Sequence, residues 1–114
     1  MEKIVQQSLY YDFYGELLNE HQKSIYEDAV FHDLSLGEIA QERSISRQGV
    51  HDMIRRCDRI LAGYEEKLHL IERFQKTKED VEQIRQHAKT LTPENMDDRK
   101  KDILTLTDRI LDEL

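Results

Sequence analysis

Residues 34–56, with the sequence LSLGEIAQERSISRQGVHDMIRR, constrain the fold more than any other part of this chain. Ser35 followed by Glu38 is the pattern of a capping box, which starts a helix, and Ser46 is a residue type that caps a second one. The turn between these helices is about three residues long, at residues 43–45, which is the length that a helix-turn-helix requires. The stretch therefore predicts a helix-turn-helix.

Two pairs of apolar residues flank the predicted caps. Leu34 precedes the first cap, and Ile39 follows that cap by four positions. Ile45 and Val50 flank the second cap in the same way. Such pairs form a hydrophobic staple, which fixes the direction in which the chain enters a helix. We therefore expect a short helix over about residues 36–42, followed by a longer one.

The chain before this motif also has helical periodicity. Over residues 3–18 an apolar residue recurs at every fourth position, which predicts a first helix with one buried face: Val5, Leu9, Phe13 and Leu17. Asn19 with Gln22 is a capping-box pattern, and it predicts a second helix that ends near His32. This helix would bury Ile25, Tyr26, Ala29 and Val30. No segment alternates strictly between apolar and polar residues, so we predict an all-α fold.

A heptad seam follows the turn, with apolar residues alternately four and three positions apart: Val50, Ile54, Cys57, Leu61, Tyr64, Leu68 and Ile71. The seam predicts a helix of about 28 residues that begins at Ser46. It can pack on helices of the same chain, which is the default near Val50, or on a second copy. We expect a homodimer, because a helix of this length exposes more apolar surface than two short helices can cover.

The seam then fades, and two further helices are predicted. Thr77 with Asp80 is placed to cap a fifth helix, and Pro93 suits the first turn of a sixth. Their apolar residues are Val81, Ile84, Ala88 and Leu91, then Ile103, Leu106, Ile110 and Leu114. We predict a helix-turn-helix domain over residues 1–72 and a helical extension over residues 73–114. The extension packs on that domain or mediates dimerisation.

The charge of the chain limits its partners. The 114 residues carry a formal net charge of −7, which argues against indiscriminate binding of nucleic acid. Residues 35–64 differ from the rest, with five arginines against four acidic residues. No apolar run approaches the roughly 20 residues of a membrane-spanning helix, and the start of the sequence lacks a signal-peptide pattern. We expect a cytoplasmic protein without disulfides, because Cys57 is the single cysteine.

No pattern of residues indicates catalysis. The sequence lacks a glycine-rich phosphate loop and an HExxH motif. The five histidines are scattered without the spacing of metal ligands. We therefore expect neither an enzyme nor a bound metal or cofactor, and we expect Cys57 to be a small buried apolar residue.

The second helix of the motif has an apolar and a polar side. The apolar side suits packing on the first helix: Val50, Met53, Ile54 and Cys57. The polar side carries the residues that we expect to contact DNA: Ser46, Arg47, Gln48, His51, Asp52, Arg55, Arg56 and Arg59. In the major groove Arg suits guanine and Gln suits adenine, whereas Arg56 and Arg59 are better placed for phosphates. Alternatively, the arginines form a solvated surface and pair with Glu42, Asp52 and Asp58.

The stretch DLSLGEIAQERSISRQGV resembles region four of bacterial sigma factors, whose helix-turn-helix reads a promoter element. The matching framework positions are Leu34, Ile39, Ala40, Ile45, Ser46 and Val50. With YYDFYGELL near its start and a helical C-terminal half, the whole chain resembles the YlxM family of small helical bacterial proteins.

This resemblance implies a helix-turn-helix regulator that contacts double-stranded DNA at Arg47, Gln48, His51 and Arg55. Asp52 departs from the basic or neutral residue that suits a groove-facing surface. Genes of the family tend to lie beside the gene for the GTPase of the signal recognition particle, which implies components of that particle as alternative partners. In that alternative the protein is an adaptor that acts through protein or RNA contacts instead of DNA.

Overall fold

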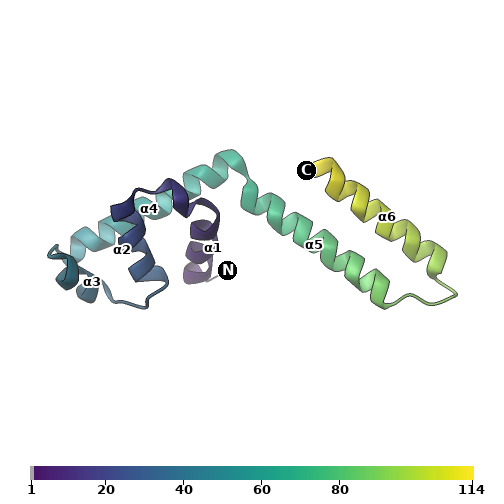
Figure 1. Ribbon diagram of the computed structural model, residues 1–114, viewed down its shortest axis with the longest axis horizontal. Coiled ribbons are helices and arrows are strands. Elements are labelled where there is room, and N and C mark those ends of the chain that lie inside the picture. Colours follow the sequence, from purple (N-terminus) through teal and green to yellow (C-terminus); the bar gives the residue numbers. More distant parts are fainter. Residues whose placement is uncertain (1) are drawn as a thin grey trace. The chain divides into compact units, whose positions relative to one another are not determined.

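The computed structural model describes residues 2–114, and all regular secondary structure in that range is helical (Figure 1). The elements are α1 (Lys3–Tyr14), a 3₁₀ turn (Gly15–Leu17), α2 (Glu20–Val30), α3 (Leu36–Arg43), α4 (Arg47–Leu68), α5 (Leu70–Lys89) and α6 (Met96–Glu113). The predicted all-α fold is therefore confirmed for these residues. The chain divides into two compact units, Met1–Ile71 and Glu72–Leu114, which we call the N-terminal unit and the C-terminal hairpin.

Three helices of the N-terminal unit start at the caps that the sequence predicted. The side chain of Asn19 accepts a hydrogen bond from the N–H of Gln22 at 2.8 Å, and Gln22 returns one at 3.0 Å. Ser35 and Glu38 exchange the same two bonds, both at 3.1 Å. Ser46 accepts from the N–H of the residue three positions on at 2.9 Å. Each bond satisfies a backbone donor that has no partner inside its helix.

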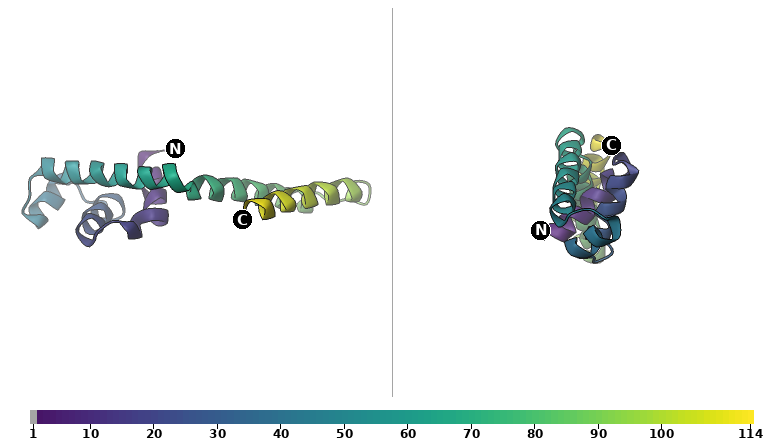
Figure 2. Two further views of the ribbon diagram at one scale, coloured as in Figure 1. Left: turned by 90° about the horizontal axis from the view of Figure 1, so that it is seen from above. Right: turned by 90° about the vertical axis from the view of Figure 1, so that its left-hand side faces the viewer.

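The core of the N-terminal unit forms along α4. Figure 2 (left) shows α2 and α3 on one side of this helix, whereas α1 crosses it. One buried cluster joins α2, α3 and α4: Ile25, Ile39, Ala40 and Val50. A second cluster contains Tyr14, Leu18, Tyr26, Cys57, Leu61 and Ile71. Ile54 and Tyr64 pack against these clusters, so most of the heptad seam is used within one chain. Leu68 is the exception, because it is 44% exposed.

The first helix is shorter than predicted. α1 ends at Tyr14, and the chain continues as a 3₁₀ turn instead of a regular α-helix to residue 18. A 3₁₀ turn has about 3.0 residues per turn instead of 3.6, so it changes which side chains face the core. Leu18 is consequently buried, whereas Leu17, which the periodicity placed on the buried face, is 53% exposed.

α4 also ends earlier than predicted, at Leu68, so it is a helix of 22 residues. His69 adopts the left-handed conformation with φ 56°, and α5 begins directly afterwards at Leu70. The predicted start near Thr77 is therefore wrong. A single left-handed residue ends a helix because it turns the next backbone carbonyl out of the helical ladder.

Side chains of the N-terminal unit satisfy the backbone at this break. The hydroxyl of Tyr14 accepts a hydrogen bond from the N–H of Leu70 at 3.2 Å. The carboxylate of Glu65 accepts one from the N–H of Ile71 at 3.0 Å, and Tyr14 donates its own hydroxyl proton to Glu65. Tyr14 lies 56 positions before Leu70, so no local pattern could predict this end of the helix.

The C-terminal hairpin contains α6 and all of α5 except its first two residues, and the two helices run antiparallel and side by side in both views (Figures 1 and 2). Asp80, predicted as part of a cap, lies instead inside α5 and is 3% exposed. Its Oδ1 atom lies 3.4 Å from Nη1 of Arg109, and Lys76 pairs with Glu113 near the open end. Leu106 is the one buried apolar residue in the described range 72–114.

The connection between α5 and α6 differs from the prediction, because α6 begins at Met96 and not at Pro93. Asn95 holds the connection. Its Oδ1 accepts a hydrogen bond from the N–H of Thr92 at 2.8 Å, and its Nδ2 donates to the carbonyl of Thr90 at 2.9 Å. In the described range, no helix has both the length and the apolar composition that crossing a membrane requires.

Candidate nucleic-acid interface

The candidate interface depends on the turn between α3 and α4. Ser44 adopts the left-handed conformation with φ 55°, which ends α3. The N–H of Ile45 donates to the carbonyl of Ala40 at 3.1 Å and closes the turn. Ser46 then caps α4 with its hydroxyl oxygen. The connection between α3 and α4 is therefore three residues long, and the first helical residue of α4 is Arg47.

A charged pair fixes α3 against α2. Nη2 of Arg43 lies 2.6 Å from Oδ2 of Asp28 and donates a second bond to Ser24 at 2.6 Å. Burial alone would raise the pKa of Asp28, but hydrogen bonds from His32 and Arg43 outweigh that effect and hold the pKa below its usual range. The carboxylate is therefore charged at neutral pH, and it locks the first helix of the motif in place.

The two sides of α4 differ as the sequence predicted. Val50 and Cys57 are 0% exposed, and Met53 and Ile54 are partly buried against both clusters. Burial raises the pKa of the Cys57 thiol to about 11, so the thiol stays protonated at neutral pH. All residues that we predicted to contact nucleic acid are exposed, and we call them the outer face: Ser46, Arg47, Gln48, His51, Asp52, Arg55, Arg56 and Arg59.

The helical spacing brings these residues together along one surface. Gln48, Asp52, Arg55 and Arg59 follow one another at intervals of four, three and four, so they form its central row. Arg47 and Arg56 lie on opposite flanks of this row. A methyl group at Gly37 of α3 would lie 3.8 Å from Nε of Arg47, so Arg47 extends past the start of the neighbouring helix.

The arginines of the outer face have no ion-pair partner within residues 2–114: Arg47, Arg55, Arg56 and Arg59. The alternative in which they pair with Glu42, Asp52 and Asp58 is therefore not what the structure contains. Asp52 accepts a hydrogen bond from Nε2 of Gln48 at 2.9 Å, and its Oδ1 lies 3.8 Å from Nδ1 of His51.

Asp58 is unavailable to the arginines because it turns toward the core. Its Oδ1 accepts the hydroxyl of Tyr26 at 2.5 Å, and Gln7 donates to both carboxylate oxygens at 3.1 and 3.2 Å. Burial and the bond to Asp58 raise the pKa of Tyr26, so this tyrosine remains a donor. These contacts tie α1 and α2 to the middle of α4, at the boundary between its buried side and the outer face.

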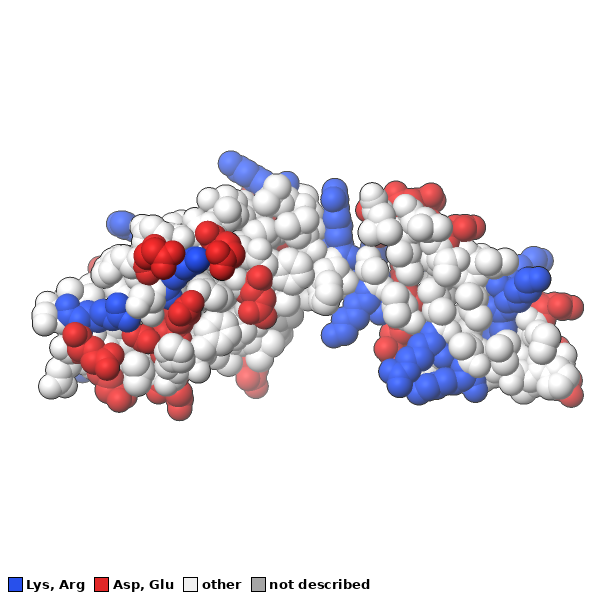
Figure 3. Space-filling model, viewed as in Figure 1, with Lys and Arg blue, Asp and Glu red and all other residues white. Residues whose placement is uncertain are grey.

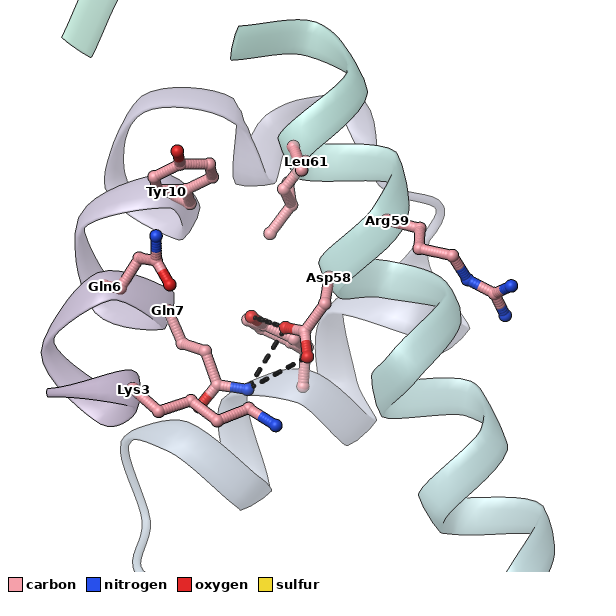
Figure 4. A pocket seen from close by; sticks show the side chains of 9 residues that line it. Lys3, Gln6, Gln7, Tyr10, Asp58, Arg59 and Leu61 are labelled. Carbon is pink, nitrogen blue, oxygen red and sulfur yellow. Dashed lines mark hydrogen bonds between the residues drawn. The ribbon is translucent and has the colours of Figure 1, made fainter. Parts of the chain in front are cut away.

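A small pocket of about 340 Å³ lies beside this network, between α1 and α4. Figure 4 shows Gln7 and Tyr10 of α1 facing Asp58 and Leu61 of α4 across it. The guanidinium of Arg59 points away from the cavity. Arg59 therefore stays on the outer face, although it is among the residues that line the pocket.

The residues that hold α4 and α3 against their neighbours could not be recognised from the sequence. Asp58 was expected to be a surface carboxylate, and neither Gln7 nor the Asp28–Arg43 pair stood out. Each of these contacts joins residues that are at least 15 positions apart. A helical periodicity shows which side of a helix is polar, but it does not show which distant side chain a polar group meets.

Negative charge gathers elsewhere on the N-terminal unit. Figure 3 shows acidic side chains (red) over α1 and α2. Lys23 lies among them and pairs with Glu16 at 3.1 Å and with Glu20 at 3.8 Å. Because α1 and α2 cover the inner side of α4, the unit has an acidic side and a separate outer face with unpaired arginines. In the part of the chain that the structure describes, no cluster of acidic, histidine or cysteine residues could hold a metal ion.

Comparison with known proteins agrees with this architecture. Residues 1–103 match a family described as "Putative helix-turn-helix protein, YlxM / p13 like". The chain belongs to the YlxM / p13-like family. It is 42% identical over 88 residues to the UPF0122 protein YlxM of Bacillus subtilis (strain 168), covering 77% of this chain and 80% of the relative. It is 36% identical over 107 residues to a UPF0122 protein of Thermoanaerobacter sp. (strain X514), covering 94% and 89%.

A third relative matches over a shorter stretch. A UPF0122 protein of Caldanaerobacter subterraneus subsp. tengcongensis is 44% identical over 79 residues, which is 69% of this chain and 68% of the relative. The resemblance to the YlxM family that the sequence motifs indicated is thus confirmed. Membership establishes a helix-turn-helix protein of this YlxM / p13-like type, and the geometry above shows where the motif lies.

Proposed function

We propose that this YlxM-family protein is a regulator that binds double-stranded DNA by placing the outer face of α4 in the major groove. One observation carries the proposal. Four arginines without ion-pair partners lie on an exposed helix face directly after a capped turn, and the opposite face is buried. A major groove about 12 Å wide accepts an α-helix, and recognition helices contact bases with their first turns.

The position of each residue suggests its role. Arg47 and Gln48 lie in the first turn of α4, where base edges are read, with His51 and Arg55 one turn and two turns further on. Three further residues are suited to contact phosphates: Ser46, Arg56 and Arg59. The hydroxyl of Ser46 accepts the N–H of Gly49, which leaves its own proton free for a phosphate oxygen.

Asp52 gives this interface selectivity. A carboxylate beside phosphates is unfavourable, so the outer face gains little from contacts that ignore sequence. The same carboxylate orients Gln48 through the 2.9 Å bond, and a carboxylate can also accept from the amino group of cytosine. Together with the net charge of −7, this favours binding to one specific site over general affinity. A homodimer would present two such faces to paired half-sites.

The test begins with selection of bound sequences from a random-sequence duplex library. The enriched duplex is then titrated with protein by fluorescence anisotropy at several salt concentrations. We expect affinity to fall steeply with salt, and we expect Arg47→Glu to weaken it by at least about 100-fold, because it removes a base contact and adds repulsion.

The matched control is Lys67→Glu, which changes the charge by the same amount on the same helix. Lys67 is exposed and lies about 30 Å further along α4. This variant should bind within about threefold of the wild type, since charges beyond a Debye length are screened. Circular dichroism should show unchanged helix content in both. Equal binding by Arg47→Glu and the wild type would contradict the assignment of the outer face.

A second candidate function is an adaptor for the signal recognition particle, which the family resemblance implies. The acidic side of α1 and α2 favours it, because such a surface suits a basic protein partner. A pulldown with the purified GTPase of the particle, at near-physiological salt and after nuclease treatment, tests it. Retention that is lost in Glu16→Lys but kept in Arg47→Glu would support the adaptor, and no retention at all would rule it out.

A further inference from the structure

Asp52 is the single carboxylate among the residues of the outer face. Its side chain is 67% exposed, so it takes no part in the core of the N-terminal unit. Helix stability explains its presence only weakly. Asp52 lies beyond the first turn of α4, where a negative charge gains from the helix dipole, and a Gln–Asp pair four positions apart stabilises a helix only slightly. A carboxylate on a surface that faces phosphates instead needs a partner in the ligand.

The contacts of Asp52 direct its carboxylate toward the start of α4. Arg55 and Arg56 lie three and four positions further on, at spacings that allow an ion pair on a helix. Among the residues that the structure describes, however, neither arginine pairs with Asp52. Its Oδ1 atom instead accepts the 2.9 Å hydrogen bond from Gln48 and lies 3.8 Å from Nδ1 of His51. The carboxylate therefore lies over the first turns of the helix, where recognition helices contact bases.

One oxygen of this carboxylate is free for a ligand. A carboxylate has no donor, and its two oxygens together offer about four acceptor positions. Gln48 uses one of the positions on Oδ1. Oδ2 accepts no hydrogen bond from any residue in the range 2–114. The bond from Gln48 limits the rotation of the carboxylate, so the outer face presents Oδ2 as an acceptor that is already oriented.

An acceptor of this kind selects among the four bases. In the major groove, the bases present hydrogen-bond donors only at the N6 amino group of adenine and the N4 amino group of cytosine. Guanine and thymine present acceptors there, which repel a carboxylate. Adenine also places its N7 acceptor beside N6, whereas cytosine presents no acceptor of its own. Cytosine is therefore the base that a single carboxylate oxygen fits best.

We propose that Asp52 determines the base specificity of this interface, and that its Oδ2 atom accepts a hydrogen bond from N4 of a cytosine in the major groove. The inference rests on the proposed function and deepens it by naming a base in the bound site. Gln48 has a positioning role through its bond to Oδ1. The ligand is then a duplex with a cytosine opposite Asp52, because guanine or thymine there leaves the carboxylate unpaired beside other acceptors.

The first experiment compares the sequences that the wild type and three variants select from one random-sequence duplex library. The wild type should enrich duplexes with cytosine at one position. Asp52→Asn has the same shape but carries both a donor and an acceptor, so it should select adenine at that position, through N6 and N7. Asp52→Ala should show no preference at that position and keep the rest of the selected sequence. The control is Glu66→Ala, which removes an exposed carboxylate about 21 Å further along α4 and should select the wild-type sequence.

The second experiment removes one group from the DNA. In the duplex that the wild type selects, the cytosine is replaced by pyrimidin-2-one, which lacks the amino group, and affinity is measured by fluorescence anisotropy. Wild-type binding should weaken by at least about 10-fold, because a charge-assisted hydrogen bond is lost and the carboxylate stays unpaired. Asp52→Ala should bind both duplexes equally within about twofold, which also accounts for any change in the duplex itself. Gln48→Ala should keep most of the loss, since Gln48 positions the carboxylate and does not read this base.

The outcomes separate this inference from the proposed function. If the wild type enriches no duplex, the proposed function fails and the inference fails with it. If the wild type and Asp52→Ala select the same base at every position, DNA binding stands and the role of Asp52 is wrong. A loss with pyrimidin-2-one that disappears in Gln48→Ala but persists in Asp52→Ala would assign the cytosine contact to Gln48 instead. Circular dichroism checks the fold, which substitution of an exposed side chain should leave unchanged.

Discussion

The N-terminal unit and the C-terminal hairpin have similar sequence patterns but very different interiors. Both consist of amphipathic helices, yet ten of the eleven buried apolar residues among residues 2–114 lie between Tyr14 and Ile71. The hairpin contributes only Leu106. The difference follows from the number of neighbours, because three elements pack on α4 and a single helix accompanies α5 within its unit.

Helical periodicity indicates which side of a helix is apolar, but it does not show whether the chain supplies enough surface to bury that side. The seam of α4 is covered by α1, α2 and α3, which leaves the outer face free for a ligand. Within the hairpin, Val81, Leu104 and Leu111 are by contrast 50%, 52% and 66% exposed. The N-terminal unit therefore buries one side of α4 within the chain and exposes the other, whereas the hairpin buries little apolar surface within its own unit.

The largest expected effect on the difference between the two units comes from removing a buried side chain of the N-terminal unit. Leu61 is 0% exposed and packs with Tyr14, Tyr26 and Cys57. We expect Leu61→Ala to lower the free energy of unfolding of the N-terminal unit by about 3 kcal/mol, through lost burial and the cavity left behind. Native-state hydrogen exchange of the α2 and α4 amides measures this unit separately, since the two units need not unfold together.

Leu17→Ala is the control for this experiment, because Leu17 belongs to the same unit and is 53% exposed. It should cost less than about 1 kcal/mol. Amides of α6 should exchange at unchanged rates in both variants. If the two leucines had equal effects, the separation between a packed unit and a solvated surface would be wrong.

A smaller effect is expected from the polar contact that fixes α2 to α3. The side chain of Asp28 is 13% exposed and that of Arg43 is 26% exposed. Asp28→Asn should lower the stability of the N-terminal unit by about 2 kcal/mol at neutral pH, because it removes a charge-assisted bond and leaves Arg43 unpaired. Hydrogen exchange of the α2 and α3 amides, compared with those of α6, measures this loss.

The pH dependence of the same pair has a definite sign. The pKa of Asp28 is lower in the folded chain than in the unfolded one. The unfolded chain therefore takes up the proton first, and the stabilisation is complete above the unfolded pKa of about 3.9. It is lost as the pH falls through the lower, folded pKa. Urea unfolding between neutral and acidic pH should show a steeper loss for the wild type than for Asp28→Asn, and parallel curves would refute this account.

The fold could be predicted wherever its signals are local. Ser35, Glu38 and Ser46 hydrogen-bond to residues three positions away, so the sequence places the helix starts that form the motif. The break at His69 could not be predicted, because it depends on the hydroxyl of Tyr14 across 56 positions. Asp80 was misassigned for the same reason, since its partner is Arg109 on another helix.

The candidate interface shows the same division. Helical periodicity alone places Gln48, Arg55 and Arg59 on one exposed surface, as the structure confirms. Whether those arginines form ion pairs depends in part on Asp58. The carboxylate of Asp58 is instead hydrogen-bonded by Tyr26 and Gln7, which lie 32 and 51 positions away in the sequence. Surface composition is local information, whereas the pairing of charges depends on tertiary structure.

The smallest expected effect on stability comes from a buried carboxylate of the hairpin, Asp80. Oδ2 of the buried Asp80 has no hydrogen-bond partner within residues 2–114, and Oδ1 reaches Arg109 only at 3.4 Å. Replacing such a group by an apolar side chain is often stabilising. Asp80→Leu should therefore slow hydrogen exchange of the α5 and α6 amides, with a rise of about 1 kcal/mol in the free energy of their opening. Glu79→Leu is the matched control, because Glu79 is exposed and should gain nothing. Amides of α2 and α4 should not change in either variant. A loss of stability in Asp80→Leu would show instead that the pair with Arg109 stabilises the hairpin. The hairpin would then resemble the N-terminal unit, in which buried polar contacts hold the helices together.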